Sequence, residues 1–250
     1  MKGIVAFVLA VGLVAAGLWL STGLGAIQIW LFGGGLIGLV GISAESFLEQ
    51  PTSSEPRDQY QAFTLWIAPG LLVVSGLWLT QVTPPESQMV VVAGAALLMA
   101  ALLMGLKSSL EPGGRYSRAG RFVANLALYL VTFLLFALIY HTKERSLVTA
   151  SATGLVALLA ALEALRSGKG RRPFGWRMAA LAGLVVAETT WALNYWPVSG
   201  LVGGALLLLT FYVFTGLVVA IQEGALERRM LLEYGTVGIA GFMAIAWAVL

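Results

Sequence analysis

The sequence predicts an all-α membrane protein, a single transmembrane domain over residues 1–250 built as a polytopic bundle of about nine spans. Hydrophobic residues make up 59% of the chain, charged residues only 11%, and the mean hydropathy is +0.88. Soluble domains carry roughly 25% charged residues. Several apolar runs have the ~17–25 residues that cross the hydrocarbon core as a helix. Membrane β-strands alternate in polarity, whereas residues 201–220 are apolar on every face.

The predicted spans follow one another with short connections. Their expected ranges are residues 3–20, 24–43, 63–82, 89–106, 122–140, 146–165, 178–196, 201–221 and 234–250. Small residues recur at every fourth position in the second, sixth and ninth spans, and such stripes let another helix backbone approach closely. The stripes are Gly34 and Gly38; Thr153, Ala157 and Ala161; and Thr236, Ala240, Ala244 and Ala248.

The distribution of basic residues predicts the orientation. With the N-terminus in the cytoplasm, every Lys and Arg except Lys143 and Arg145 falls on the cytoplasmic side. Short cytoplasmic loops are enriched in Lys and Arg, so the C-terminus is expected outside. The longest connection, residues 44–62, combines Pro, Ser and acidic residues and is predicted to be an exposed loop.

Several chemistries are excluded by composition. The chain has no cysteine, so it forms no disulfide and no thiolate metal site. Its one histidine, His141, cannot supply the two imidazoles of a b-type haem. We therefore predict no metal site and no catalytic cluster.

Glu188 is the acidic residue that falls near the middle of a predicted span. A charged carboxylate at that depth costs ~2.5–3.5 kcal/mol on insertion scales. Its side chain is expected to face the eighth or the fifth span, where it serves either as a proton or ligand site or as a packing contact. Trp191 and Asn194 on the same span, and Thr210 and Tyr212 at matching depth in the eighth, complete this candidate site.

No cofactor is predicted. A bound lipid, a quinone or a carotenoid could lie against Trp191, although an interfacial belt or packing role is favoured for that indole. The basic loops are expected to contact anionic lipids or a partner. The residues concerned are Arg115, Arg118, Arg121, Arg171 and Arg172. Nucleic acid is not an expected partner.

The chain from about residue 116 to 234 resembles an uncharacterised family of bacterial polytopic inner-membrane proteins. The residues that carry the resemblance are Glu188, Trp191, Asn194, Trp196, Pro197, Gly203, Gly204, Phe211 and Tyr212. The resemblance implies a multi-pass protein of the bacterial cytoplasmic membrane and supplies no catalytic residue.

The resulting expectation is a non-enzymatic scaffold or accessory subunit of a larger membrane complex, in contact with lipids and with other subunits or copies of itself. One alternative is a small-solute or proton-coupled transporter that uses Glu188. A weaker alternative is a lipid-modifying enzyme at the basic cytoplasmic rim.

Overall fold

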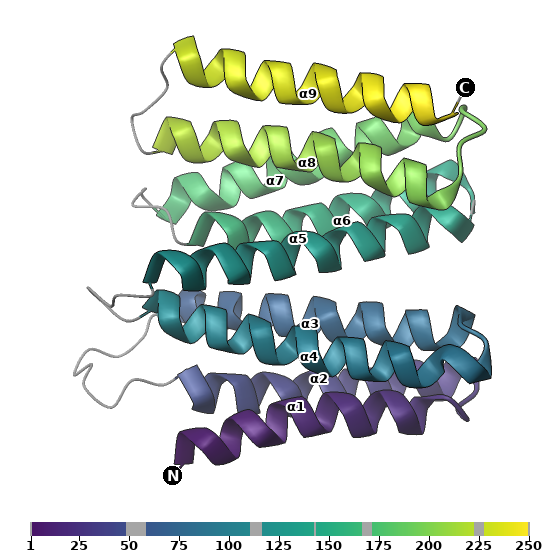
Figure 1. Ribbon diagram of the computed structural model, residues 1–250, viewed down its shortest axis with the longest axis vertical. Helices are drawn as coiled ribbons and strands as arrows, with labels where there is room; N and C mark the ends of the chain where they lie inside the picture. Colours follow the sequence, from purple (N-terminus) through teal and green to yellow (C-terminus); the bar gives the residue numbers. More distant parts are fainter. Residues whose placement is uncertain are drawn as a thin grey trace. The chain divides into compact units, whose positions relative to one another are not determined.

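The computed structural model describes residues 2–48, 59–110, 117–142, 144–166, 172–222 and 228–249. Helices are the only regular structure in these ranges (Figure 1). They are α1 (Lys2–Ser21), α2 (Ala26–Leu48), α3 (Gln59–Val82), α4 (Pro85–Leu110), α5 (Ser117–Thr142), α6 (Ser146–Arg166), α7 (Arg172–Leu193), α8 (Gly200–Gln222) and α9 (Arg228–Val249). The all-α class is therefore confirmed.

Seven of the described helices are long and apolar enough to cross a membrane. The segments are Gly3–Ser21, Ile27–Leu48, Phe63–Val82, Pro85–Ser109, Arg118–Thr142, Ser146–Arg166 and Gly200–Ile221. The helices α7 and α9 fall outside this set. Arg177 and Glu188 lower the hydropathy of α7, and the side chains of α9 are described only in part.

Most helices extend further into polar sequence than predicted, because backbone hydrogen bonds between residues four apart continue past the apolar run. The helix α2 continues to Leu48, where Ala44 and Leu48 are buried. Residues 44–48 of the predicted loop are therefore helical, as are residues 59–62, while residues 49–58 lie outside the described part. The helix α7 ends at Leu193 rather than at residue 196, so Asn194 and Trp196 belong to the connection.

The chain divides into two compact units, Met1–Val131 and Thr132–Leu250, and the boundary falls within α5. In the first unit α1 contacts α2, α3 and α4, and α2 contacts α3 and α4 (Figure 1). Fully buried Val14, Val40, Val73 and Met99 form part of its core. Gly105 of α4 and Gly120 of α5 bring these two helices within backbone contact, because a Cβ on Gly105 would lie 2.8 Å from the nitrogen of Ala124.

Polar contacts tie both ends of the first unit. At the end that carries the α1–α2 and α3–α4 turns, Gln81 Nε2 donates to the carbonyl oxygen of Ser21 at 3.1 Å. Near the other end, Trp66 Nε1 donates to Glu45 Oε2 at 3.0 Å, and the Nζ of Lys107 lies 4.2 Å from the centre of the Phe47 ring.

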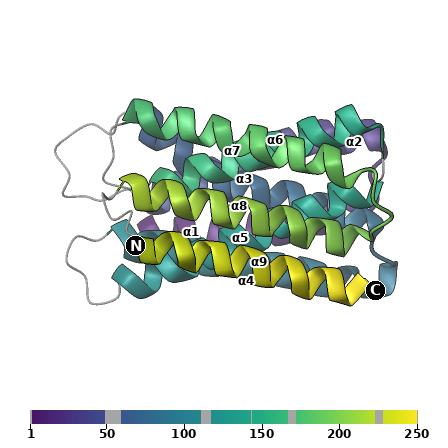
Figure 2. The ribbon, with the colours of Figure 1, turned by 90° about the horizontal axis from the view of Figure 1, so that it is seen from above.

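The second unit contains the second half of α5 with α6, α7, α8 and α9. The helix α7 contacts α6 and α8, and α9 contacts α8 (Figures 1 and 2). Phe136 of α5 meets Phe211 of α8 edge to face, with ring centroids 6.3 Å apart. On the other side of α8, Tyr212 contacts Tyr234 of α9 with a centroid distance of 6.0 Å.

Candidate functional site

The helix α7 is held tightly against α6 by small residues. A Cβ added to Gly183 would lie 2.7 Å from the carbonyl oxygen of Gly154, and one added to Gly154 would lie 3.0 Å from the Cβ of Ala187. Thr153, Ala157 and Ala161 of the predicted stripe are all fully buried. The close-packing seam predicted for the sixth span is therefore confirmed.

Hydrogen bonds close the same seam. Thr153 Oγ1 and Thr190 Oγ1 lie 2.8 Å apart, and each hydroxyl also contacts a carbonyl of its own helix. Asn194 Nδ2 donates to Thr149 Oγ1 at 3.2 Å, one helical turn further along. These polar groups form hydrogen bonds with one another or with their own helices, so the α6–α7 contact is a packed structural interface.

Glu188 lies at the middle depth of this pair. Its neighbour Ala187 faces Gly154, which is near the centre of α6 (Ser146–Arg166), a helix of membrane-crossing length. Glu188 is also about 16 Å along the helix from Arg177, at ~1.5 Å per residue.

The Glu188 side chain is exposed, on the face of α7 turned away from α6. Val186 and Thr190, two positions before and after it, are fully buried. A helix turns by about 100° per residue because it has 3.6 residues per turn, so burial of these two neighbours directs Glu188 outward. No hydrogen bond or ion pair joins Glu188 to another residue in the described part of the chain.

Of the other predicted members of the site, Trp191 shares the exposed face of α7 with Glu188, whereas the contacts of Thr210 and Tyr212 are with other residues. Thr210 Oγ1 donates to the carbonyl oxygen of Leu206 in its own helix, and Tyr212 packs against Tyr234. Trp191 is half exposed on the outer face of α7, where its Nε1 lies 3.4 Å from Tyr195 Oη. A similar predicted depth does not determine which way each helix is rotated about its axis.

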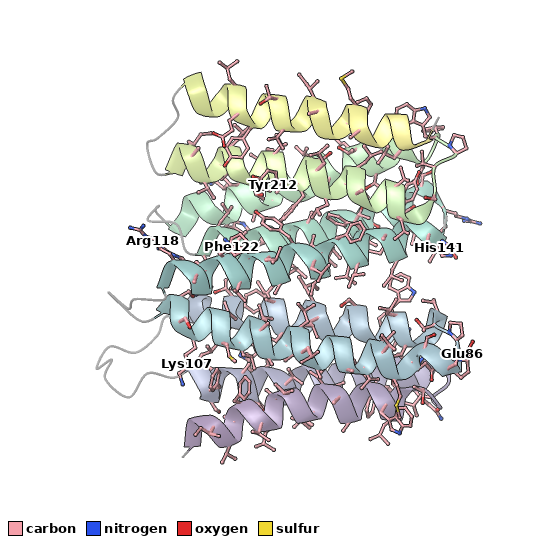
Figure 3. The ribbon with its side chains drawn as sticks, in the orientation of Figure 1. Glu86, Lys107, Arg118, Phe122, His141 and Tyr212 are labelled. Atoms are coloured by element: carbon pink, nitrogen blue, oxygen red, sulfur yellow. The ribbon has the colours of Figure 1, made fainter. Side chains whose placement is uncertain are left out.

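Two of the basic residues expected at the rim are described with their side chains. Arg118 and Arg121 are exposed near the start of α5, and Figure 3 shows Arg118 at the end of α5 opposite His141. Arg172 begins α7, but its side chain is not among those described, and Arg115 and Arg171 lie outside the described residues.

In the described part, no group of three or more His, Asp or Glu side chains is arranged to hold a metal ion.

Sequence reasoning missed two close contacts in the second unit. Tyr140 Oη donates to the carbonyl oxygen of Leu193 at 2.6 Å, and the Tyr140 ring occupies the space above Gly203. Glu163 and Arg166 form a buried ion pair at the end of α6, with Arg166 Nη2 3.0 Å from Glu163 Oε1. The i,i+3 spacing of Glu163 and Arg166 is a signal that could have identified the second contact.

No curated protein and no solved structure matches this chain. One family model matches residues 7–248, a longer stretch than the predicted resemblance over residues 116–234, and the family is uncharacterised, as predicted. The chain belongs to the family described as proteins of unknown function, DUF5656.

Proposed function

We propose that this chain is a nine-span protein of the bacterial cytoplasmic membrane, with its N-terminus inside and its C-terminus outside. It acts as a non-enzymatic scaffold or accessory subunit of a larger membrane complex. The nine-span topology is supported by seven helices of membrane-crossing length, by the packing of α7 along α6, and by the one-sided distribution of Lys and Arg.

The exposed carboxyl group of Glu188 carries the proposal. A single ionisable group facing lipid at mid-depth is unfavourable by ~2.5–3.5 kcal/mol on insertion scales, and such groups are found facing protein or water. The chain supplies no partner for it in its described part. A transmembrane helix of another subunit that offers a hydrogen-bond donor to Glu188 relieves this cost.

The exposed surface around Glu188 is apolar and aromatic. Leu181, Leu184 and Trp191 are exposed with it at spacings of three and four residues on one face of α7, and the exposed Tyr195 follows in the connection after Leu193. Aromatic residues are enriched at protein interfaces. This face, defined by these four residues and Glu188, is the proposed assembly face.

The small-residue stripe of α9 also supports assembly. Its described members Thr236, Ala240 and Ala244 are exposed. A stripe of this kind allows another transmembrane helix to approach closely, and here the chain leaves it uncovered.

The test is purification of the full-length tagged chain from its native membrane in a mild detergent, followed by identification of the proteins that remain bound. We expect a defined partner with the wild type, and its loss in Glu188→Leu. Glu188→Gln keeps a side chain that forms hydrogen bonds and should retain part of the partner. Glu233→Gln, an exposed carboxyl group on α9, is the matched control and should retain all of it.

Three outcomes contradict the proposal. One is a wild-type chain that purifies alone as a monomer. The second is full retention of the partner by Glu188→Leu. The third is proton-linked solute uptake by vesicles containing the purified chain that Glu188→Gln abolishes, which identifies a transporter instead.

A further inference from the structure

The first unit contains an apolar groove between α2 and α3 with a volume of about 430 Å³. This volume lies within the ~300–1,000 Å³ range of small-ligand sites. The first half of α2 and the last turns of α3 form the groove, and both helices belong to the seven of membrane-crossing length. The groove therefore lies in the half of these spans next to the α1–α2 and α3–α4 turns.

Glycines open the floor of this groove. A Cβ placed on Gly33 would lie 2.9 Å from Leu77 Cδ1, so this glycine lies directly against the end of the Leu77 side chain of α3. A Cβ placed on Gly34 meets no heavy atom within 4 Å. Gly34 lines the groove and faces its empty space, so its missing side chain creates room that the protein does not fill.

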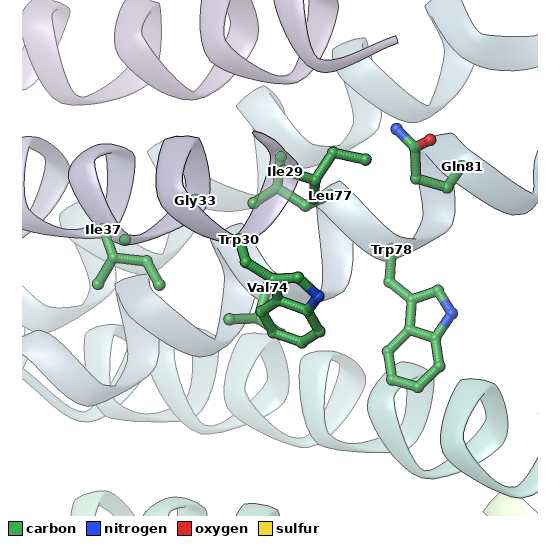
Figure 4. Close-up of a pocket in the computed structure, with 9 residues that line it drawn as sticks. Ile29, Trp30, Gly33, Ile37, Val74, Leu77, Trp78 and Gln81 are labelled. Atoms are coloured by element: carbon green, nitrogen blue, oxygen red, sulfur yellow. The ribbon is translucent and has the colours of Figure 1, made fainter. Parts of the chain in front are cut away.

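The two ends of the groove differ in polarity. Ile37 and Val74 lie toward one end, whereas Gln81 and the indole nitrogen atoms of Trp30 and Trp78 lie toward the other (Figure 4). Neither indole N–H has a hydrogen-bond partner in the described part of the chain. Gln81 uses one amide hydrogen on Ser21, and a carboxamide has a second hydrogen and an acceptor oxygen to offer.

We propose that this groove, defined by Trp30, Gly34, Ile37, Val74, Trp78 and Gln81, is a binding site for one membrane glycerolipid. An acyl chain lies over Gly34 between Ile37 and Val74. The ester carbonyl oxygens accept hydrogen bonds from the indoles and from Gln81, at the depth where Trp is enriched in membranes. The groove lining contains no Lys or Arg, so recognition is by the acceptor-rich glycerol region and not by the charge of the head group.

The observations favour a lipid over a helix of a second copy. A helix satisfies its own backbone hydrogen bonds and is about 10–12 Å wide with its side chains. Its backbone carbonyl groups are therefore occupied and do not accept hydrogen bonds from the three donors at one end of the groove. An acyl chain with ester groups matches both the apolar trough and the donors.

The test uses full-length protein in vesicles of equal parts phosphatidylethanolamine and phosphatidylglycerol. A trace of phosphatidylcholine carries a photoactivatable diazirine in its acyl chain, and labelled residues are mapped by peptide mass spectrometry. We expect labelling to concentrate on residues 30–37 and 74–81, above the level at exposed apolar positions such as Leu97. Gly34→Leu fills the groove and should lose this labelling, and Gly34→Ala should lose part of it.

Gly35→Leu is the matched control, because Gly35 is exposed, has no heavy atom within 4 Å of an added Cβ, and does not line the groove. It should label as the wild type does. Equal labelling of Gly34→Leu and Gly35→Leu would mean that only general bilayer lipid contacts the groove, which overturns the proposal. Cross-links between residues 30–37 of two copies would overturn it in favour of a second chain.

Discussion

The phenol of Tyr140 in α5 donates a hydrogen bond of 2.6 Å to the carbonyl oxygen of Leu193, the last residue of α7. The same oxygen atom of Tyr140 lies 3.4 Å from the carbonyl oxygen of Trp196. The last carbonyl groups of a helix have no partner within the helix. The Leu193 carbonyl oxygen accepts from two donors outside α7, the backbone N–H of Trp196 at 2.9 Å and the phenol of Tyr140. A residue from a different helix thereby contributes to holding the end of α7.

Tyr140→Phe is expected to destabilise the second unit by about 1 kcal/mol, the usual net value of one hydrogen bond in water and in membranes. The ring still fits above Gly203, so the loss isolates the hydroxyl group. The measurement is equilibrium unfolding of the purified chain in mixed micelles. Tyr195→Phe is the control, since Tyr195 is 78% exposed, and an equal effect in both variants would contradict the role of the Tyr140 bond.

Gly204→Ala is expected to destabilise the chain by about 1–3 kcal/mol, the typical cost of overpacking. An added Cβ would lie 2.8 Å from the backbone nitrogen and Cα of Ala137 in α5, and backbone atoms cannot rotate away. Gly235→Ala is the matched control, because nothing lies within 4 Å of its added Cβ. Gly235→Ala should be neutral or gain up to about 1 kcal/mol from helix propensity. Comparable unfolding midpoints for the two variants would exclude the close α5–α8 contact.

Gly41→Ala and Gly38→Ala, three positions apart on α2, are expected to have different effects on the free energy of unfolding. An added Cβ on Gly41 would lie 2.5 Å from the Trp66 ring, whose Nε1 is hydrogen-bonded to Glu45. The indole must give up that bond or move α3, so we expect a loss of about 1–3 kcal/mol. Gly38 has no atom within 4 Å of an added Cβ, so Gly38→Ala should be neutral or stabilising in thermal unfolding. Greater destabilisation by Gly38→Ala would contradict the observed rotation of α2.

The sequence predicted those features that depend on local composition. Long apolar runs predicted the helices, because helix is the structure that satisfies the backbone within lipid. The Thr153, Ala157 and Ala161 stripe predicted a packed seam, and all three residues are buried. In each case the signal lies within one segment of the chain.

The rotation of each helix could not be predicted in the same way. Gly34 and Gly38 were expected to receive another backbone, but Gly33 and Gly41 contact α3 instead. Glu188 was expected to face the eighth or the fifth span and is exposed. In a helix that is apolar on all sides, no hydrophobic stripe distinguishes the protein-facing side from the lipid-facing side. The orientation is set by tertiary contacts such as Thr153–Thr190, which a single segment does not reveal.

The buried Glu163–Arg166 pair predicts an asymmetric response to mutation. Arg166→Met leaves a carboxylate with 6% exposed side-chain area and no cation beside it, and breaking a buried pair in this way costs about 3 kcal/mol or more. Glu163→Gln should cost less, because the long Arg166 side chain at the helix end can move its charge toward water. The double variant Glu163→Leu with Arg166→Met removes both charges and should recover most of the loss. Equilibrium unfolding in mixed micelles gives the change in unfolding free energy for each of the three variants. A double variant that is less stable than Arg166→Met would contradict this prediction, because it would show that the ion pair adds net stability.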